Sequence, residues 1–137
     1  MSVLQMPANA SGKKNRAPAR RISVYNLTRD TVLASAAEIA DRGATRRKGL
    51  LGRSGLRDGE GLWIVPCESV HTIGMQFAID LVYLDRNHRV RKVRSSVPAW
   101  RMSACLLAHS VLELPAGTIE RTETMAGDQI LLSLPED

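Results

Sequence analysis

The alternation of apolar and polar positions along this chain predicts a series of short β-strands. Apolar residues alternate over 21–27, and a compact apolar run occupies 61–65. Such patterns are typical of strands with at least one buried face, and turn-forming Gly, Pro, Asn and Asp residues separate them. Many short strands with such turns predict a mainly β fold, a compact antiparallel β-sandwich or barrel with one or two short helices.

The clearest pair of strands is a hairpin in the middle of the chain. The apolar run IDLVYLD at 79–85 is followed, after a short polar turn, by the mixed run RVRKVRS at 89–95. We expect the turn near Asn87, because asparagine tolerates a positive φ. Two further strands are expected, one in SVLELP at 110–115 and one behind the Gly–Asp turn at 127–128.

Residues 31–40 carry two conflicting signals. Ser35–Glu38 has the pattern of a capping box and would begin a helix near Ala36. The same segment also suits the second strand of a hairpin after the turn TRDT. A short helix over 44–51 is expected in the glycine-punctuated segment that follows. The basic residues there are Arg46, Arg47, Lys48, Arg53 and Arg57. Such a cluster is typical of a solvated face.

Length and charge indicate one domain behind a basic tail. The chain has 137 residues, 44% hydrophobic and 24% charged, which suffices for one core. Five of its 19 basic residues lie in 1–21, where no acid occurs, so 22–137 holds 14 basic and 14 acidic residues. We expect a disordered tail over 1–21, able to make weak nonspecific contacts with anions or nucleic acid, and a single β-domain over 22–137.

The sequence predicts neither a membrane-spanning segment nor a secretory signal. No apolar run approaches the roughly 20 residues of a membrane-spanning helix, so no membrane span is expected. The N-terminal sequence has no apolar segment behind a basic one, so we expect a cytoplasmic protein. Cys67 and Cys105 are then expected to be reduced thiols.

Four short motifs follow one another along the chain. They are GLLGR at Gly49–Arg53, HTIGMQFAID at His71–Asp80, LELPAG at Leu112–Gly117 and the closing Gly127–Asp128. Together they resemble the domain of unknown function 192 family (DUF 192), over about 22–134. Two positions depart from the family pattern: Ala78, where proline is frequent, and His88, where a turn glycine is common.

The resemblance implies a fold but no activity. It implies a compact antiparallel β-sandwich of jelly-roll character with a small helical element, and it favours a strand over 31–40. It carries over no catalytic residue and no cofactor.

The segment 66–85 holds the side chains that are the best candidates for metal binding or catalysis. Cys67, His71 and Met75 stand four residues apart and share one side of an extended chain. They would suit Cu(I), or Zn(II) without Met75, while Cys67 with His71 as its base would suit a hydrolytic site. Against these alternatives, the chain has no short C-x₂₋₄-C pair and no GxSxG motif. His71 and Thr72 would otherwise satisfy backbone groups at a turn.

The favoured function is non-enzymatic binding of a small ligand or a protein partner, without a cofactor. Asp80 and Glu113 each stand between apolar neighbours in a predicted strand. We expect them to join His71 in a partly buried polar network. The residues expected to form the ligand pocket are His71, Asp80, Trp100, Arg101 and Glu113.

Overall fold

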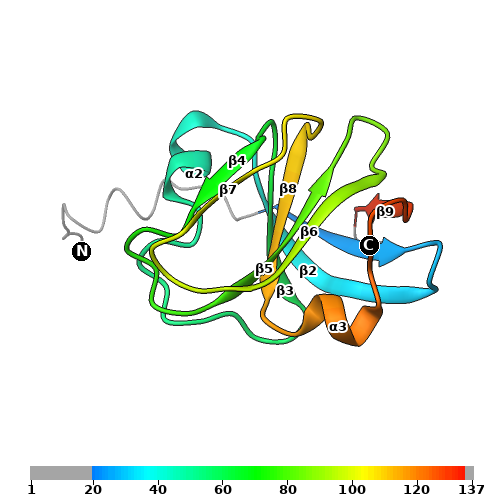
Figure 1. Ribbon diagram of the computed structural model, residues 1–137, viewed down its shortest axis with the longest axis horizontal. Coiled ribbons are helices and arrows are strands. Elements are labelled where there is room, and N and C mark those ends of the chain that lie inside the picture. The colour runs from blue at the N-terminus through cyan, green and yellow to red at the C-terminus, as the bar shows by residue number, and fades with distance from the viewer. Residues whose placement is uncertain (1–19, 135–137) are drawn as a thin grey trace, which may run out of the picture.

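The computed structural model describes residues 20–134, which form a large β-sheet, a small one and two short helices (Figure 1). In chain order these are β1 Arg21–Asn26, β2 Thr31–Ala40, α2 Gly43–Lys48, β3 Glu60–Ile64, β4 Ser69–His71, β5 Ile79–Leu84, β6 Val90–Val97, β7 Met102–Ala104, β8 Ser110–Pro115, α3 Thr118–Thr122 and β9 Ile130–Ser133. The large sheet has the order β6-β5-β8-β3-β2-β1-β9, and the small sheet pairs β4 with β7. The mainly β fold with short helices is confirmed.

The large sheet curls so that its two ends approach each other. Arg89, just before β6, forms an isolated bridge with Gln129, just before β9. Beside it, the Val90 backbone N–H donates to the Asp128 carbonyl over 2.8 Å. The strands pair antiparallel except β2 with β3, which run parallel and are connected along the chain by the segment that contains α2. The result is a half-barrel, and the expected jelly-roll arrangement is not confirmed.

Strands β5 and β8 are buried on both faces. Their register pairs Val82 with Leu112 on one face, where both pack inside the curl against Ile119 of α3. It pairs Tyr83 with Val111 on the other face, in a second apolar core. The Tyr83 hydroxyl meets the Ser103 hydroxyl of β7 at 2.9 Å, so the small sheet covers this second core. The fold therefore has two hydrophobic cores, one on each side of its central strands.

The ambiguous segment 31–40 is strand β2, as the resemblance implied, and the helix predicted from its capping box is wrong. β2 pairs with β1 on one side and with β3 on the other. Ala34 and Ala37 are fully buried in the core inside the curl. Pairing to two neighbours and burial of small residues outweigh helix propensity, which contributes only tenths of a kcal/mol per residue.

The short helix expected over 44–51 is α2, but it ends at Lys48. Gly49 follows with φ 51° and ψ −127°, a conformation that residues with a side chain avoid. Among residues 20–134, no helix has the length and apolar character needed to cross a membrane.

The central hairpin is confirmed, with a change in its turn. The residue with positive φ is His88, at 62°, and not Asn87. The Asp85 carboxylate accepts hydrogen bonds from the backbone N–H of Asn87 and of Arg89, at 2.9 and 3.0 Å. This acceptor fixes Asn87 before the reversal, so the left-handed conformation falls one residue later.

The expected basic tail lies outside the described residues, except for its last two. Arg21 begins β1, and Arg20 forms an ion pair with Asp41.

Candidate functional site

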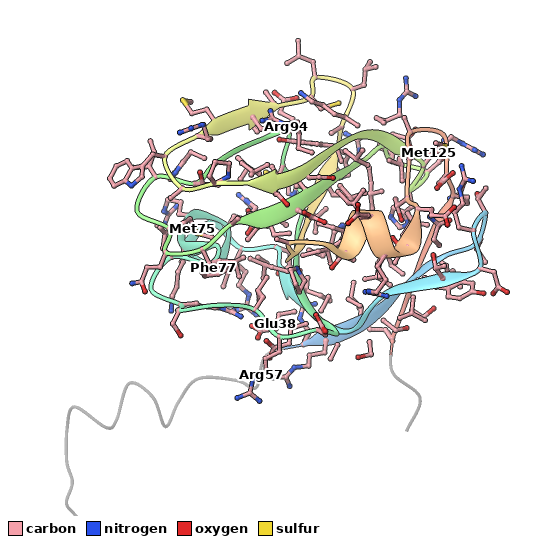
Figure 2. All side chains as sticks on the ribbon, turned by 60° about the horizontal axis from the view of Figure 1, so that its bottom comes forward. Glu38, Arg57, Met75, Phe77, Arg94 and Met125 are labelled. Carbon is pink, nitrogen blue, oxygen red and sulfur yellow. The ribbon has the colours of Figure 1, made fainter. Side chains whose placement is uncertain are left out.

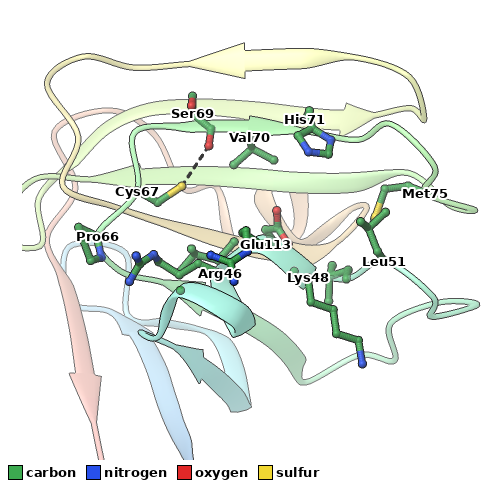
Figure 3. Close-up of a pocket in the computed structure, with 15 residues that line it drawn as sticks. Arg46, Lys48, Leu51, Pro66, Cys67, Ser69, Val70, His71, Met75 and Glu113 are labelled. Carbon is green, nitrogen blue, oxygen red and sulfur yellow. Dashed lines mark hydrogen bonds between the residues drawn. The ribbon is translucent and has the colours of Figure 1, made fainter.

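An open pocket of about 520 Å³ lies between α2 and β4, above the large sheet (Figure 3). Leu50, Ile64, Val70 and Met75 supply apolar walls, and Val70 points into the space from the small sheet. The polar side chains in its lining are Arg46, Arg47, Lys48, Cys67, Ser69, His71 and Glu113. Its size is within the range of small-molecule sites, and its lining combines apolar walls with a few polar groups as such sites do.

Glu113 of β8 is the buried acid of this pocket. Its register partners are Leu62 of β3 and Leu81 of β5, so apolar side chains flank it on both sides. Only 4% of the residue is exposed, and its Oε1 atom has no hydrogen-bond partner within residues 20–134. Burial raises the pKa of the Glu113 carboxyl from 4.5 to about 7, against a lowering by the charge of Arg53. A carboxyl without partners in such surroundings is costly to ionise.

The end of α2 approaches this carboxyl closely. A Cβ atom on Gly49 would lie 3.8 Å from Glu113 Oε1, so the glycine brings the backbone directly over the acid. The basic side chains of the last turn of α2 (Arg46, Arg47 and Lys48) then fall on the pocket rim. The basic cluster expected to be a solvated face therefore contributes three residues to the pocket.

Cys67 lines the pocket as a thiol that is hard to ionise. Its Sγ–H donates to the Ser69 carbonyl over 3.1 Å, drawn as a dashed line in Figure 3. Burial raises the pKa of the Cys67 thiol, and the positive charge of Arg46 only partly opposes this. An activated nucleophile needs the opposite shift. Cys67 and Cys105 are both free thiols.

The three residues of the soft-metal hypothesis do share the pocket. Cys67, His71 and Met75 all belong to its lining. Nowhere in residues 20–134, however, do three His, Cys, Asp or Glu side chains gather closely enough to hold a metal ion. Methionine is a weak ligand for metals other than soft ones, so Cys67 and His71 would need a third donor for Zn(II).

The expected polar network of His71, Asp80 and Glu113 does not form. His71 and Glu113 line the pocket, but Asp80 pairs with Leu114 and therefore points to the other face of the sheet. There the Asp80 carboxylate is fully buried and accepts hydrogen bonds from the backbone N–H of Ser96 and of Ile119, each at 2.8 Å. Asp80 therefore holds β6 and α3 in place, and it is not part of the pocket.

Trp100 and Arg101 lie outside the pocket lining, in the loop between β6 and β7, and both are exposed. The buried Thr72 holds this loop. Its carbonyl accepts from the Trp100 N–H at 3.0 Å, and its hydroxyl accepts from the Arg101 N–H at 2.8 Å. The expectation that a residue of the pair His71–Thr72 satisfies backbone groups at a turn is confirmed for Thr72.

The fold and the pocket define a class of small β-domain, in which a curled sheet carries a two-stranded cover and a short helix. The chain belongs to the DUF192 family, described as an uncharacterized ACR, whose model matches residues 25–132. The resemblance carried by the four sequence motifs is thereby confirmed.

Two solved structures share this fold. One is a crystal structure of a candidate transcription regulator from Sinorhizobium meliloti 1021, with 16% identity and a TM-score of 0.74, over 86% of this chain and 98% of that one. The other is a protein of unknown function from Novosphingobium aromaticivorans DSM 12444, with 20% identity and a TM-score of 0.71, over 93% and 99%. At these identities the likeness concerns the fold alone. No curated protein matches the chain.

Proposed function

We propose that this domain binds a small molecule in the pocket between α2 and β4, with Glu113 as the group that recognises it. The observation that carries the proposal is the Glu113 carboxyl, which is buried in an open pocket while its Oε1 lacks any hydrogen-bond partner among the described residues. Leaving such a group unpaired costs about 1–3 kcal/mol or more. A ligand that supplies the missing partner would recover this free energy on binding.

The lining defines the chemistry of the ligand. Glu113 calls for a hydrogen-bond donor at the inner end, either an amine or a hydroxyl. The walls formed by Leu50, Ile64 and Met75 call for an apolar body. The basic rim from α2 calls for an anionic group at the outer end, because oppositely charged groups attract across a partly desolvated site. The expected ligand is therefore a small apolar acid that carries an amine or hydroxyl.

Binding is favoured over hydrolysis at the same pocket by the state of Cys67. A thiol with a raised pKa, which donates its hydrogen to the Ser69 carbonyl, is a poor nucleophile at neutral pH. A copper or zinc role for Cys67 and His71 has only their common place in the lining to support it.

The test uses three probes that differ only in the group at the end opposite the carboxylate: 6-aminohexanoate, 6-hydroxyhexanoate and hexanoate. All three share the apolar body and the carboxylate, and the last lacks the donor. The amino acid and the hydroxy acid should shift the backbone amide resonances of pocket residues in two-dimensional NMR, and hexanoate should bind at least about tenfold more weakly, as expected for one lost hydrogen bond to a charged group.

The variants Glu113→Gln and Arg46→Gln separate the two ends of the site. Glu113→Gln should reduce the preference for the donor, because a neutral amide oxygen is a weaker acceptor than a carboxylate, and Arg46→Gln should weaken all three probes. Arg57→Gln, which changes an exposed arginine outside the lining, should bind as the wild type does. Shifts scattered over the surface, or a preference for the donor that is as strong in Glu113→Gln as in the wild type, would contradict the proposal.

A further inference from the structure

An exposed apolar stripe runs along β7 and the loops on both sides of it. It consists of Trp100, Met102, Leu106 and Leu107, which are 66%, 76%, 83% and 64% exposed. Within β7, Ser103 points inward and bonds Tyr83, so its neighbours Met102 and Ala104 face outward. Trp100 lies in the loop before β7, and Leu106 and Leu107 lie in the turn after it.

The two leucines occupy the tip of a turn. The Ala108 N–H donates to the Cys105 carbonyl over 3.0 Å, which closes a β-turn with Leu106 and Leu107 as its central residues. Gly, Asn, Asp and Pro usually occupy such positions, and large apolar residues there gain nothing from the fold. In Figure 2, β7 is the outermost strand on its side of the molecule, so nothing in residues 20–134 covers it there.

Uncompensated positive charge lies beside the stripe. Lys92 of β6 donates to the Ala104 carbonyl over 2.7 Å, and Arg101 donates to the Trp100 carbonyl at 3.3 Å. Arg94, labelled in Figure 2, lies close enough for its charge to act on Tyr83 beneath β7. None of the three forms an ion pair within residues 20–134. No acid occurs in the sequence from 86 to 112. Glu68, just before β4, is an exposed acid beside this surface, since its carbonyl accepts from the Cys105 N–H.

We propose that this stripe docks the protein on the surface of an anionic lipid bilayer, with Leu106, Leu107 and Trp100 entering the interface and the three basic residues contacting headgroups. Tryptophan prefers the interface of a bilayer, and leucine prefers its hydrocarbon. Lysine and arginine beside them are attracted by the negative surface potential of such a leaflet. A second copy of the chain fits less well, because a two-fold contact would bring the three basic residues against their own copies. This surface is distinct from the pocket.

The test is sedimentation of the protein with vesicles of mixed phosphatidylcholine and phosphatidylglycerol, against vesicles of phosphatidylcholine alone. The wild type should sediment with the mixed vesicles. The variant Leu106→Ser/Leu107→Ser should lose about tenfold or more in partitioning, since burial of one leucine alone corresponds to about that factor. Leu27→Ser, an exposed leucine in the β1–β2 turn, is the matched control and should sediment as the wild type does.

A second readout follows Trp100 directly. Mixed vesicles should shift the tryptophan emission of the wild type to shorter wavelength. Trp100→Phe should abolish this shift, because the remaining tryptophan, Trp63, packs against the core and does not reach the bilayer. Near-ultraviolet circular dichroism and the thermal midpoint verify that each variant is folded. Absence of binding, full binding by the leucine variant, or a dimer that this variant dissolves would each overturn the proposal. The same holds for a preference for duplex DNA over the mixed vesicles.

Discussion

The side chain of Glu113 lowers the stability of the fold, and it is also the group proposed to bind the ligand. Its carboxyl lies between Leu62 and Leu81, its Oε1 has no hydrogen-bond partner among residues 20–134, and burial raises its pKa to about 7. Leucine or methionine at this position would pack without that cost. An acid there makes physical sense as a group reserved for a partner from outside the chain.

Replacing Glu113 with glutamine should remove a loss of stability that the wild type suffers as pH rises. The folded protein binds the Glu113 proton more tightly than the unfolded chain does. The stability that the bound proton contributes is therefore complete below pH 4.5 and is lost as the pH rises to about 7. The rise in the pKa of Glu113 corresponds to up to about 3 kcal/mol in the free energy of unfolding. The variant should equal the wild type near pH 4.5 and exceed it by up to that amount above about pH 7, in urea unfolding followed across this range.

Glu68→Gln is the matched control, because Glu68 is exposed. As a substitution at an exposed position, it should change the free energy of unfolding by less than about 0.5 kcal/mol. If Glu113→Gln behaved in the same way, the Glu113 carboxyl would not be the group that titrates in this range.

Strand register, at the scale of elements, decides what Asp80 and Glu113 do. In the sequence the two acids look alike, each between apolar neighbours in a strand. Alternation shows only that each points away from its neighbours, and both faces of β5 and β8 are apolar. Only the pairing of Asp80 with Leu114, and of Leu81 with Glu113, sends them to opposite faces. The alternation of apolar and polar residues does not reveal this register. The polar network expected from the sequence was therefore wrong.

The length of an element determined whether the sequence could reveal it. Alternation and turn residues predicted β1, the β5–β6 hairpin, β8 and β9, which have four to eight residues. With three residues each, β4 and β7 are too short to alternate visibly, and the five residues of α3 complete little more than one turn. Because β4 forms a wall of the pocket, the sequence could not locate the cavity, although His71 and Glu113 of its lining were expected in a ligand pocket. Its basic rim was visible only as a cluster of charge.

Changing Asp80 should loosen two elements at once. Asp80→Asn replaces one carboxylate oxygen by an NH₂ group, so the N–H of Ser96 in β6 or of Ile119 in α3 loses its acceptor. The expected loss is about 2–4 kcal/mol in the free energy of unfolding. Hydrogen exchange at these two amides should accelerate beyond the global change. Asp58→Asn, at an exposed acid, should alter stability by less than about 0.5 kcal/mol. Unchanged exchange at both amides would contradict this role.

Across the whole molecule, Asp128 ties the start of the chain to its end. Its Oδ2 atom accepts from Asn26 Nδ2 at 3.0 Å, from Arg29 Nε at 3.2 Å and from the Met125 N–H at 3.0 Å. Asn26 ends β1, and Asp128 precedes β9. Burial alone would raise the pKa of the Asp128 carboxyl, but these hydrogen bonds and the charge of Arg29 lower it below 3.8. The ionised carboxylate is the form that holds the end of β1 and its turn against the segment before β9.

Asp128→Asn should therefore destabilise the protein at neutral pH and hardly at all in acid. The loss at pH 7 should be about 2–3 kcal/mol, the value for hydrogen bonds to a charged group. Because the folded pKa is lowered, the stabilisation is complete above the unfolded value of 3.8 and is lost as the pH falls through the folded one. Unfolding by urea at neutral and acid pH measures this. Asp30→Asn, at an exposed turn residue, should change the free energy of unfolding by less than about 0.5 kcal/mol.

The neighbour of the first strand, β1, is the last strand of the chain, β9. During synthesis β1 can pair with β2 as soon as both have left the ribosome, but its other edge stays open until β9 emerges. Until then the buried amide of Asn26 also lacks Thr124 and Asp128. A nascent chain that lacks β9 thus exposes an unpaired, partly apolar strand edge, the kind of surface that chaperones protect and that aggregates. The sheet of this domain can be completed only after β9 has left the ribosome.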